Sequence, residues 1–159
     1  MFDLVNGLPV HPLVVHAVVV LLPLSIIGTI AIAVRPGWRV RYGNLVVATS
    51  LVATILVPVA SSSGEALQSR VGNPGEHAEL GDQLIWFALP VLILGAVLVW
   101  MSHRQHRADS AASARGGHRA VTVVAALAVL AGLAAGVQVY RVGDSGARAA
   151  WGDQVSAPR

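Results

Sequence analysis

The sequence predicts an all-α polytopic membrane protein, a single domain (residues 1–159) with four transmembrane helices in a kinked four-helix bundle. Of its 159 residues, 55% are hydrophobic and only 12% are charged, whereas a soluble domain carries about 25% charged residues. Four stretches reach the length of about 20 apolar residues that a membrane helix needs. The chain is too short to bury four such helices inside a soluble core. We expect spans at about 12–34, 42–60, 80–102 and 119–140, followed by an outward tail, 141–159.

The spans differ in their helix-shaping residues. Pro23, Pro58 and Pro90 each lie inside one of the first three spans, where a proline removes an amide donor and favours a kink. The fourth span instead carries Gly132 and Gly136 in a GxxxG pattern, which allows close helix approach. This pattern fits packing within the bundle or a homodimer. No internal repeat is evident, and the polar segment 103–119 is expected to be a flexible linker.

Arginine placement predicts the orientation. All eleven basic residues are arginine, and seven of them lie in the short loops 35–41 and 103–119. Seven of the eight acidic residues lie on the opposite side. The positive-inside rule therefore places both loops in the cytoplasm and both termini outside. Richness in Arg, Ala, Val and Gly is typical of a GC-rich bacterial genome, so we predict a multi-pass protein of the bacterial cytoplasmic membrane.

Several function classes are excluded or disfavoured by the residues present. The chain has no cysteine, which excludes disulfides, thiolate metal sites and covalently attached haem. It shows no hydrolase triad, phosphate loop or nucleotide fingerprint, and the string "GDSG" (143–146) is interpreted as a helix-capping turn. We expect an electron-transfer or accessory subunit rather than an enzyme. Its predicted partners are the lipid bilayer and a second copy or a larger membrane complex, with no nucleic acid.

Two histidines stand at the start of the first span, in "GLPVHPLVVH" (7–16). Pro12 suits a first helical turn, which places His11 at the helix mouth. His16 would lie about 7 Å deeper and about 140° further around the helix. The two rings therefore point to different sides of an intact helix. An ionisable residue within a span is a functional candidate by default, and this favours His16.

A third histidine comes from the segment before the third span, "NPGEHAELGD" (73–82). Asn73, Pro74 and Glu76 form a capping-box pattern, which predicts a helix start near residue 74 with His77 on its projecting turn. Carboxylates surround it in the sequence, and Glu65 follows the second span. We expect His11, His16 and His77 to gather at the outer face. The histidines at 103, 106 and 118 are interpreted as solvated residues of the cytoplasmic linker.

Three kinds of chemistry suit this group. A b-type haem needs two neutral imidazoles, for which His16 and His77 are the first choice and His11 a supporting residue. A divalent metal such as zinc or copper would use mixed imidazole and carboxylate ligands; the candidates are His11, His16, His77 and Glu65. Proton handling or pH sensing is the third option, because histidine titrates near neutral pH. The rings can also simply form hydrogen bonds at the membrane surface.

Short motifs along nearly the whole chain resemble a widespread bacterial family of four-span membrane proteins of unknown function. They are "HPLVVH", an HPxxVH pattern that opens the first span, "SGEAL" after the second span and "HAELGD" at the third. Some relatives are joined to Rieske or c-type cytochrome modules, so the resemblance implies a setting in membrane electron transfer. The chain departs from the family at Ala17, usually an aromatic residue followed by proline, and at Asp144, often histidine or aromatic.

The leading hypothesis is a redox-associated subunit that binds haem b or a divalent metal at the outer face through His16 and His77, supported by His11. The alternative is a non-catalytic accessory or assembly subunit that docks to a larger membrane complex. Its support is the small size of the chain and the GxxxG pattern.

Overall fold

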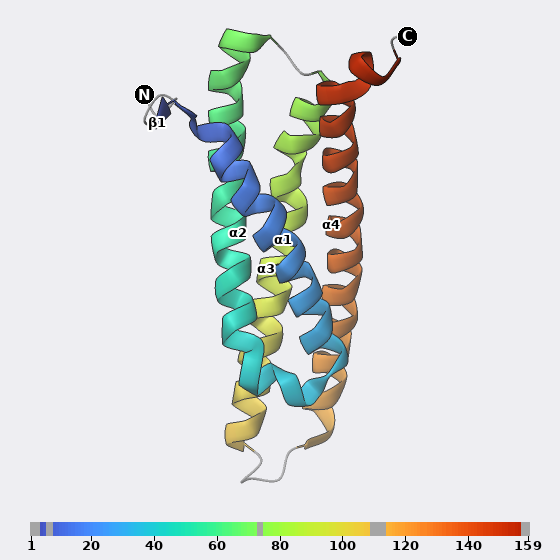
Figure 1. The fold of residues 1–159 in the computed structure, drawn as a ribbon. Coiled ribbons are helices and arrows are strands. Elements are labelled where there is room, and N and C mark those ends of the chain that lie inside the picture. Colours follow the sequence, from blue (N-terminus) through green and yellow to red (C-terminus); the bar gives the residue numbers. More distant parts are fainter. Residues whose placement is uncertain (1–3, 6–7, 73–74, 109–113, 157–159) are drawn as a thin grey trace.

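A computed structural model describes residues 4–5, 8–72, 75–108 and 114–156, in which four long helices dominate (Figure 1). A two-residue strand β1 (Leu4–Val5) pairs antiparallel with β2 (Leu8–Pro9) just before the first helix. The helices are α1 (Val10–Val34), α2 (Pro36–Val71), α3 (Glu76–Ala108) and α4 (Ala114–Ser156). Each contains a stretch long and apolar enough to cross a membrane. The predicted all-α, four-span fold is confirmed.

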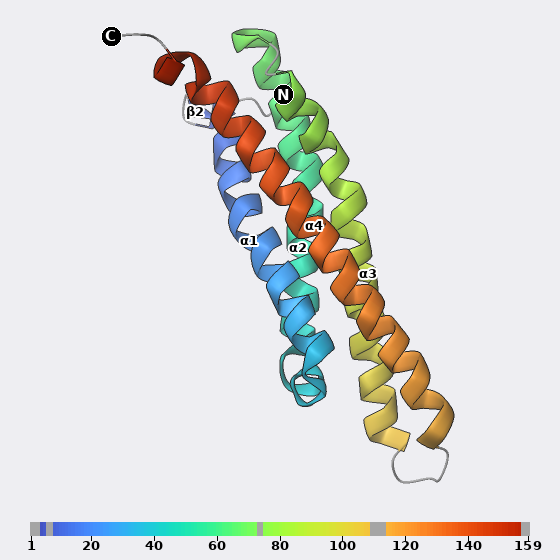
Figure 2. The same ribbon diagram turned by 90° about the vertical axis from the view of Figure 1, so that its right-hand side faces the viewer.

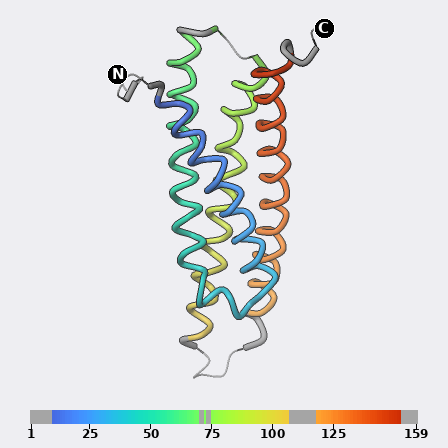
Figure 3. The backbone as a smooth tube through the Cα atoms, viewed as in Figure 1, coloured from blue at the N-terminus to red at the C-terminus, as the bar shows by residue number. Residues whose placement is uncertain are grey.

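The bundle consists of two antiparallel hairpins, α1–α2 and α3–α4, joined through the contact of α2 with α3. Helix α1 crosses the face of the bundle, starting beside α2 and ending near α4 (Figure 3). We call the end where α1 and α3 begin the histidine end, because it holds His11 and His77. The opposite end, where α1 and α3 finish, is the arginine end; it holds Arg35, Arg39, Arg41, Arg104 and Arg119.

The helices extend beyond the predicted spans. Helix α4 continues to Ser156, through the segment predicted as a tail, and most of the predicted linker 103–119 belongs to α3 and α4. Hydropathy marks only the part of a helix that lipid surrounds, whereas backbone hydrogen bonding continues past it. Serines in this continuation satisfy their hydroxyls on their own helix: Ser62 and Ser69 on α2 donate to the carbonyls of Pro58 and Ala66, at 2.8 and 2.7 Å.

Two glycines shape the connection between the hairpins. Gly72 and Gly75 have φ of +95° and +62°, a region that residues with a side chain rarely adopt. Helix α2 ends at the first of them, and α3 starts one residue after the second. The predicted cap formed by Asn73 and Pro74 lies outside the described residues. The structure thus starts α3 at Glu76, with His77 in its first turn.

Apolar residues fill the bundle and also cover its surface. One buried cluster lies toward the histidine end and a second toward the arginine end, centred on Leu22 and Leu98 respectively. Many large apolar side chains nevertheless face outward, such as Leu45 and Trp86, with 68% and 71% of their surface exposed. Exposed apolar surface on this scale is unfavourable in water and suits contact with lipid tails. Pro23, Pro58 and Pro90 lie inside uninterrupted helices.

The GxxxG pattern packs within the bundle at its first glycine. A Cβ atom on Gly132 would lie 2.9 Å from Cγ1 of Ile30 on α1, whereas one on Gly136 would meet no atom within 4 Å. Helices α4 and α1 are therefore in close contact at Gly132 but not at Gly136. This contact accounts for Gly132 without a second copy of the chain, and a homodimer stays a prediction.

A buried arginine locks the turn between α1 and α2. Arg39 donates from Nε to the carbonyl of Ile32 at 2.8 Å and from one terminal nitrogen to that of Ala33 at 2.7 Å. These carbonyls belong to the last turn of α1, where no amide of the same helix is available to them. Only Arg35 separates the two helices, so the predicted loop 35–41 is mostly the start of α2.

Candidate functional site

A cavity of about 590 Å³ opens at the histidine end, and all four helices contribute to its walls. In the ribbon view turned by 90° (Figure 2), this is the end at which α2 finishes and α3 begins. The walls are mainly apolar, with Val15, Val18 and Leu22 from α1 and Val57, Leu84 and Val139 from the other helices. His11 and His77 both line this cavity. The structure therefore brings together two of the three predicted histidines.

His11 is held by α2. Its Nδ1 lies 2.9 Å from the carbonyl oxygen of Ala60 and 3.3 Å from Oγ of Ser63. Ser63 donates its own hydroxyl proton to the same carbonyl, at 3.0 Å. A carbonyl oxygen only accepts, so Nδ1 of His11 must carry the proton and donate. In the neutral ring, Nε2 is then unprotonated and keeps a free lone pair.

His77 repeats this arrangement on α4. Its Nδ1 lies 3.1 Å from the carbonyl oxygen of Val142 and 3.3 Å from Oγ of Ser145. Ser145 donates to the carbonyl of Val142, at 3.0 Å. Because the carbonyl oxygen only accepts, Nδ1 of His77 also carries the proton, and Nε2 of the neutral ring is an acceptor.

A glycine makes room for each ring. A Cβ atom on Gly64 would lie 3.1 Å from Cε1 of His11, and one on Gly146 would lie 2.9 Å from Cε1 of His77. Each imidazole thus packs against the backbone of its partner helix, directly after the serine that it contacts. Both glycines lie inside their helices, and α2 and α4 continue past them without a break.

The two hairpins therefore share one unit: a histidine in the first turn of one helix, and a carbonyl, a serine and a glycine on the next. No repeat is evident in the sequence, and no motif there predicts a site role for Ser63, Gly64, Ser145 or Gly146. The interpretation of "GDSG" as a capping turn was wrong in this respect, because Ser145 lies inside α4. The available signal was a Ser-Gly pair late in each hairpin and a Gly-x-Pro shortly before each histidine, at 7–9 and 72–74.

His16 does not share this site. Its side chain is exposed, its Nδ1 contacts the carbonyl oxygen of Pro12 on its own helix, and it does not line the cavity. Helix α1 is intact from Val10 onward, so the rotation of about 140° over five residues turns His16 away once His11 faces α2. The structure therefore brings His77 together with His11, and not with His16 as predicted.

The predicted carboxylates are spread around the site. Glu65 and Asp82 line the cavity, Glu76 and Glu79 are exposed, and Asp144 forms an ion pair with Arg148 at 2.9 Å. Within the described part of the chain, no three His, Cys, Asp or Glu side chains come close enough to hold a metal ion together. The mixed metal site predicted from His11, His16, His77 and Glu65 is not assembled.

Comparison with known proteins gives one result. The family model described as "Predicted membrane protein (DUF2231)" matches residues 7–159. The chain belongs to the DUF2231 family. That description agrees with the four membrane-crossing helices and with the resemblance found from the motifs. Searches of curated proteins and of solved structures found no significant match.

In this DUF2231 member, a buried amide braces the helices beneath His77. Gln138 on α4 is almost completely buried, and its Nε2 donates to the carbonyl of Leu80 on α3 at 3.0 Å. Arg141 in turn donates to the side-chain oxygen of Gln138 at 3.4 Å. A buried and bonded amide ties α3 to α4 at a fixed register. The register of His77 against Val142 and Ser145 is fixed with it.

Proposed function

We propose that this DUF2231 member is a redox-associated membrane subunit that holds a haem b between its two hairpins, through Nε2 of His11 and Nε2 of His77. One observation supports the proposal most. The two imidazoles come from different hairpins, line one cavity, and have each committed Nδ1 to a carbonyl oxygen. Each neutral ring therefore has only Nε2 left as a ligand atom.

The number of ligands favours haem over zinc or copper. A porphyrin supplies four nitrogen ligands itself and leaves two axial positions, which two histidines complete. A zinc site in a protein needs three or four protein ligands. Among the described residues no third side chain of a suitable type joins the two histidines. Two imidazoles are thus the number of protein ligands that a haem would take, and they are too few for a zinc ion held by side chains alone.

The surroundings of the two rings support the same ligand. The cavity volume lies within the range of about 300–1,000 Å³ that is typical of small-molecule sites. Its valine and leucine walls suit an apolar macrocycle. Ser63 and Ser145 accept from Nδ1 and fix the ring orientation, the role that outer hydrogen-bond partners have in metalloproteins. When bound, the haem would supply one-electron transfer, which is the setting that the family resemblance implies.

The proposed site faces the outside of the cell. This part of the proposal is supported by the arginines, which gather at the opposite end of the bundle and are expected in the cytoplasm. A partner protein on the outer surface would then exchange electrons with the haem.

The test is the absorption spectrum of the purified full-length chain. The protein is produced in a bacterial host supplied with a haem precursor, purified in detergent, and recorded in oxidised and reduced form together with its haem and metal content. We expect a Soret band, the sharp α-band of a six-coordinate low-spin haem, and stoichiometric haem. The His16→Ala variant should keep this spectrum. Folded protein that stays colourless after addition of hemin would contradict the proposal and favour the accessory-subunit alternative.

A further inference from the structure

A second groove, of about 760 Å³, lies between α2 and α3 at the arginine end. Its floor is apolar and is formed by Val47 and Leu51 of α2 and by Ala96 and Val99 of α3. A Cβ atom on Gly43 would lie only 2.5 Å from a methyl group of Val99, so the two helices touch closely beside the groove. The floor is therefore an open apolar groove along two membrane-crossing helices.

The rim of this groove is polar and cationic. Arg104 lies with its guanidinium carbon 4.2 Å from the ring centroid of Trp100, and both residues line the groove. His103 lines it as well, and its buried Nε2 has no hydrogen-bond partner in the part of the chain that the structure describes. A buried polar atom without a partner calls for one, such as an ion or a ligand. Asn44 completes the rim from α2.

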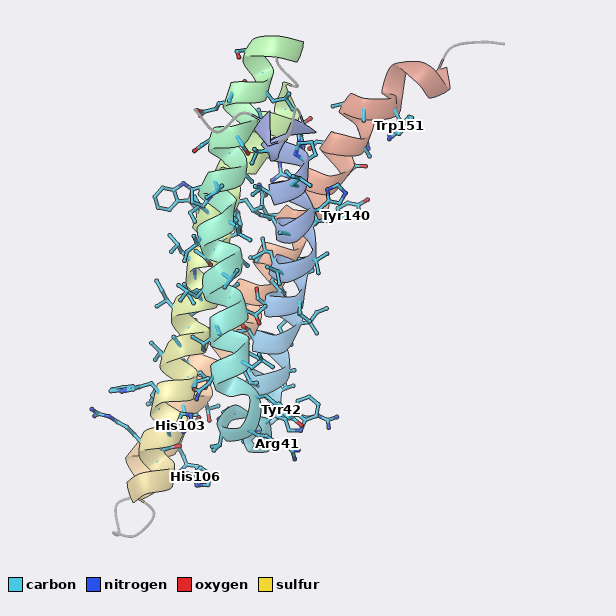
Figure 4. The ribbon with its side chains drawn as sticks, turned by 60° about the vertical axis from the view of Figure 1, so that its left-hand side comes forward. Arg41, Tyr42, His103, His106, Tyr140 and Trp151 are labelled. Carbon is cyan, nitrogen blue, oxygen red and sulfur yellow. The ribbon has the colours of Figure 1, made fainter. Side chains whose placement is uncertain are left out.

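The charged side chains that the structure describes near the rim are all cationic. Figure 4 shows His103 on α3 at the same end of the bundle as Arg41 on α2. The aspartates and glutamates whose side chains the structure describes all lie toward the histidine end; these are Glu65, Glu76, Glu79, Asp82 and Asp144. Arg104 therefore has no carboxylate partner in the described ranges, and the charges described beside this groove give it a positive field.

We propose that this groove binds one anionic phospholipid, with the phosphate on Arg104 and His103 and an acyl chain along the floor between α2 and α3. The combination of an apolar channel with a basic mouth between membrane helices suits an anionic headgroup. A zwitterionic lipid fits less well, because its own cation opposes the field of the arginines. Trp100 lies where an indole ring favours the boundary between headgroups and tails. This site is separate from the histidine cavity.

Trp100 provides the probe. The other three tryptophans, Trp38, Trp86 and Trp151, are exposed and are replaced by phenylalanine, so that Trp100 alone fluoresces. The protein is reconstituted with phosphatidylglycerol or phosphatidylcholine that carry bromine on identical acyl chains, and quenching is followed against lipid mole fraction. We expect half-maximal quenching at a clearly lower mole fraction for phosphatidylglycerol. Equal curves for the two lipids would overturn the proposal.

Variants distinguish lipid binding in the groove from a general attraction of anionic lipid to the charged surface. Arg104→Gln should raise the mole fraction of phosphatidylglycerol needed for half-maximal quenching about fivefold. Arg41→Gln removes the same charge from an exposed arginine that stacks on Tyr42 outside the groove, and should leave the curve nearly unchanged. Ala48→Phe, at an exposed position that lines the groove, should reduce quenching to the phosphatidylcholine level. Equal effects of the two arginine variants would reject the groove, as would undiminished quenching in Ala48→Phe.

Discussion

The two hairpins of this protein carry the same histidine unit but differ in length. His11 contacts Ser63 across 52 residues and His77 contacts Ser145 across 68, a difference of 16 (68 − 52). In both hairpins the histidine is the second residue of its helix, so the extra residues lie toward the arginine end, where α3 and α4 reach past the α1–α2 turn (Figure 2). The arrangement of the imidazole, the carbonyl and the serine is thus independent of how far the hairpin extends.

The turns of the hairpins also differ. The first hairpin turns at Arg35 and is held by the buried Arg39, which satisfies two carbonyls at the end of α1. In the second hairpin, residues 109–113 separate α3 from α4. The comparison shows that the histidine end repeats its chemistry while the arginine end does not.

The largest effect is expected for the histidines themselves. His11→Ala and His77→Ala each remove one of the two proposed axial ligands, so each should abolish the low-spin haem spectrum and most of the bound haem. If the hairpins are equivalent, the two losses are equal. The measurement is the haem-to-protein ratio and the electron paramagnetic resonance spectrum, with His16→Ala as the matched control. Loss in only one of the two variants would show that a single hairpin holds the ligand.

The next effect concerns the turn of the first hairpin. Arg39→Gln leaves the carbonyls of Ile32 and Ala33 without their donors, which should lower the free energy of unfolding by about 2–3 kcal/mol. Arg41→Gln changes an exposed arginine and should cost less than about 0.5 kcal/mol. Unfolding in mixed detergent–SDS micelles measures both values. Similar values for the two variants would mean that Arg39 does not stabilise the turn.

A smaller effect distinguishes the two glycines. The added methyl group of Gly146→Ala meets His77 at 2.9 Å, whereas that of Gly64→Ala meets His11 at 3.1 Å. Displacing the ring should weaken haem binding about tenfold in Gly146→Ala, because mutating the groups that orient a metal ligand typically has an effect of this size. The effect should be smaller in Gly64→Ala. Haem titration of the apoprotein measures this order. Gly136→Ala, where the methyl group meets nothing within 4 Å and lies outside the cavity lining, serves as the control, and an equal loss there would refute the steric explanation.

The smallest effect is expected for the serines. Ser63→Ala and Ser145→Ala each remove the acceptor at 3.3 Å and keep the carbonyl that also accepts from Nδ1. Each variant should therefore weaken haem binding by about 0.5–1 kcal/mol, a few-fold in affinity, and the two losses should be equal. The same titration compares them with Ser62→Ala, which alters a neighbouring serine that donates to Pro58. A loss of haem affinity above tenfold in either variant would show that the serine, and not the carbonyl, orients the imidazole ring.

Much of the fold could be predicted from the sequence, because a lipid environment demands long apolar helices. The choice between His11 and His16 could not. Helix α1 is apolar on all sides, so its periodicity does not reveal which face packs against α2. The helical rotation over the five residues from His11 to His16 indicates only that the two rings point to different sides. Ser63 and Ser145 were equally hidden, because a serine in a helix commonly bonds its own backbone, and its second contact depends on a helix distant in the sequence.

For the proposed haem, the position of both imidazoles in the opening turns of α1 and α3 would have an energetic consequence. A charge that moves through the whole bilayer does work against the transmembrane voltage, about 2.3 kcal/mol per 100 mV. An electron that enters and leaves at this level crosses almost none of that voltage. A redox centre held by His11 and His77 would therefore work at the same driving force in energised and de-energised cells.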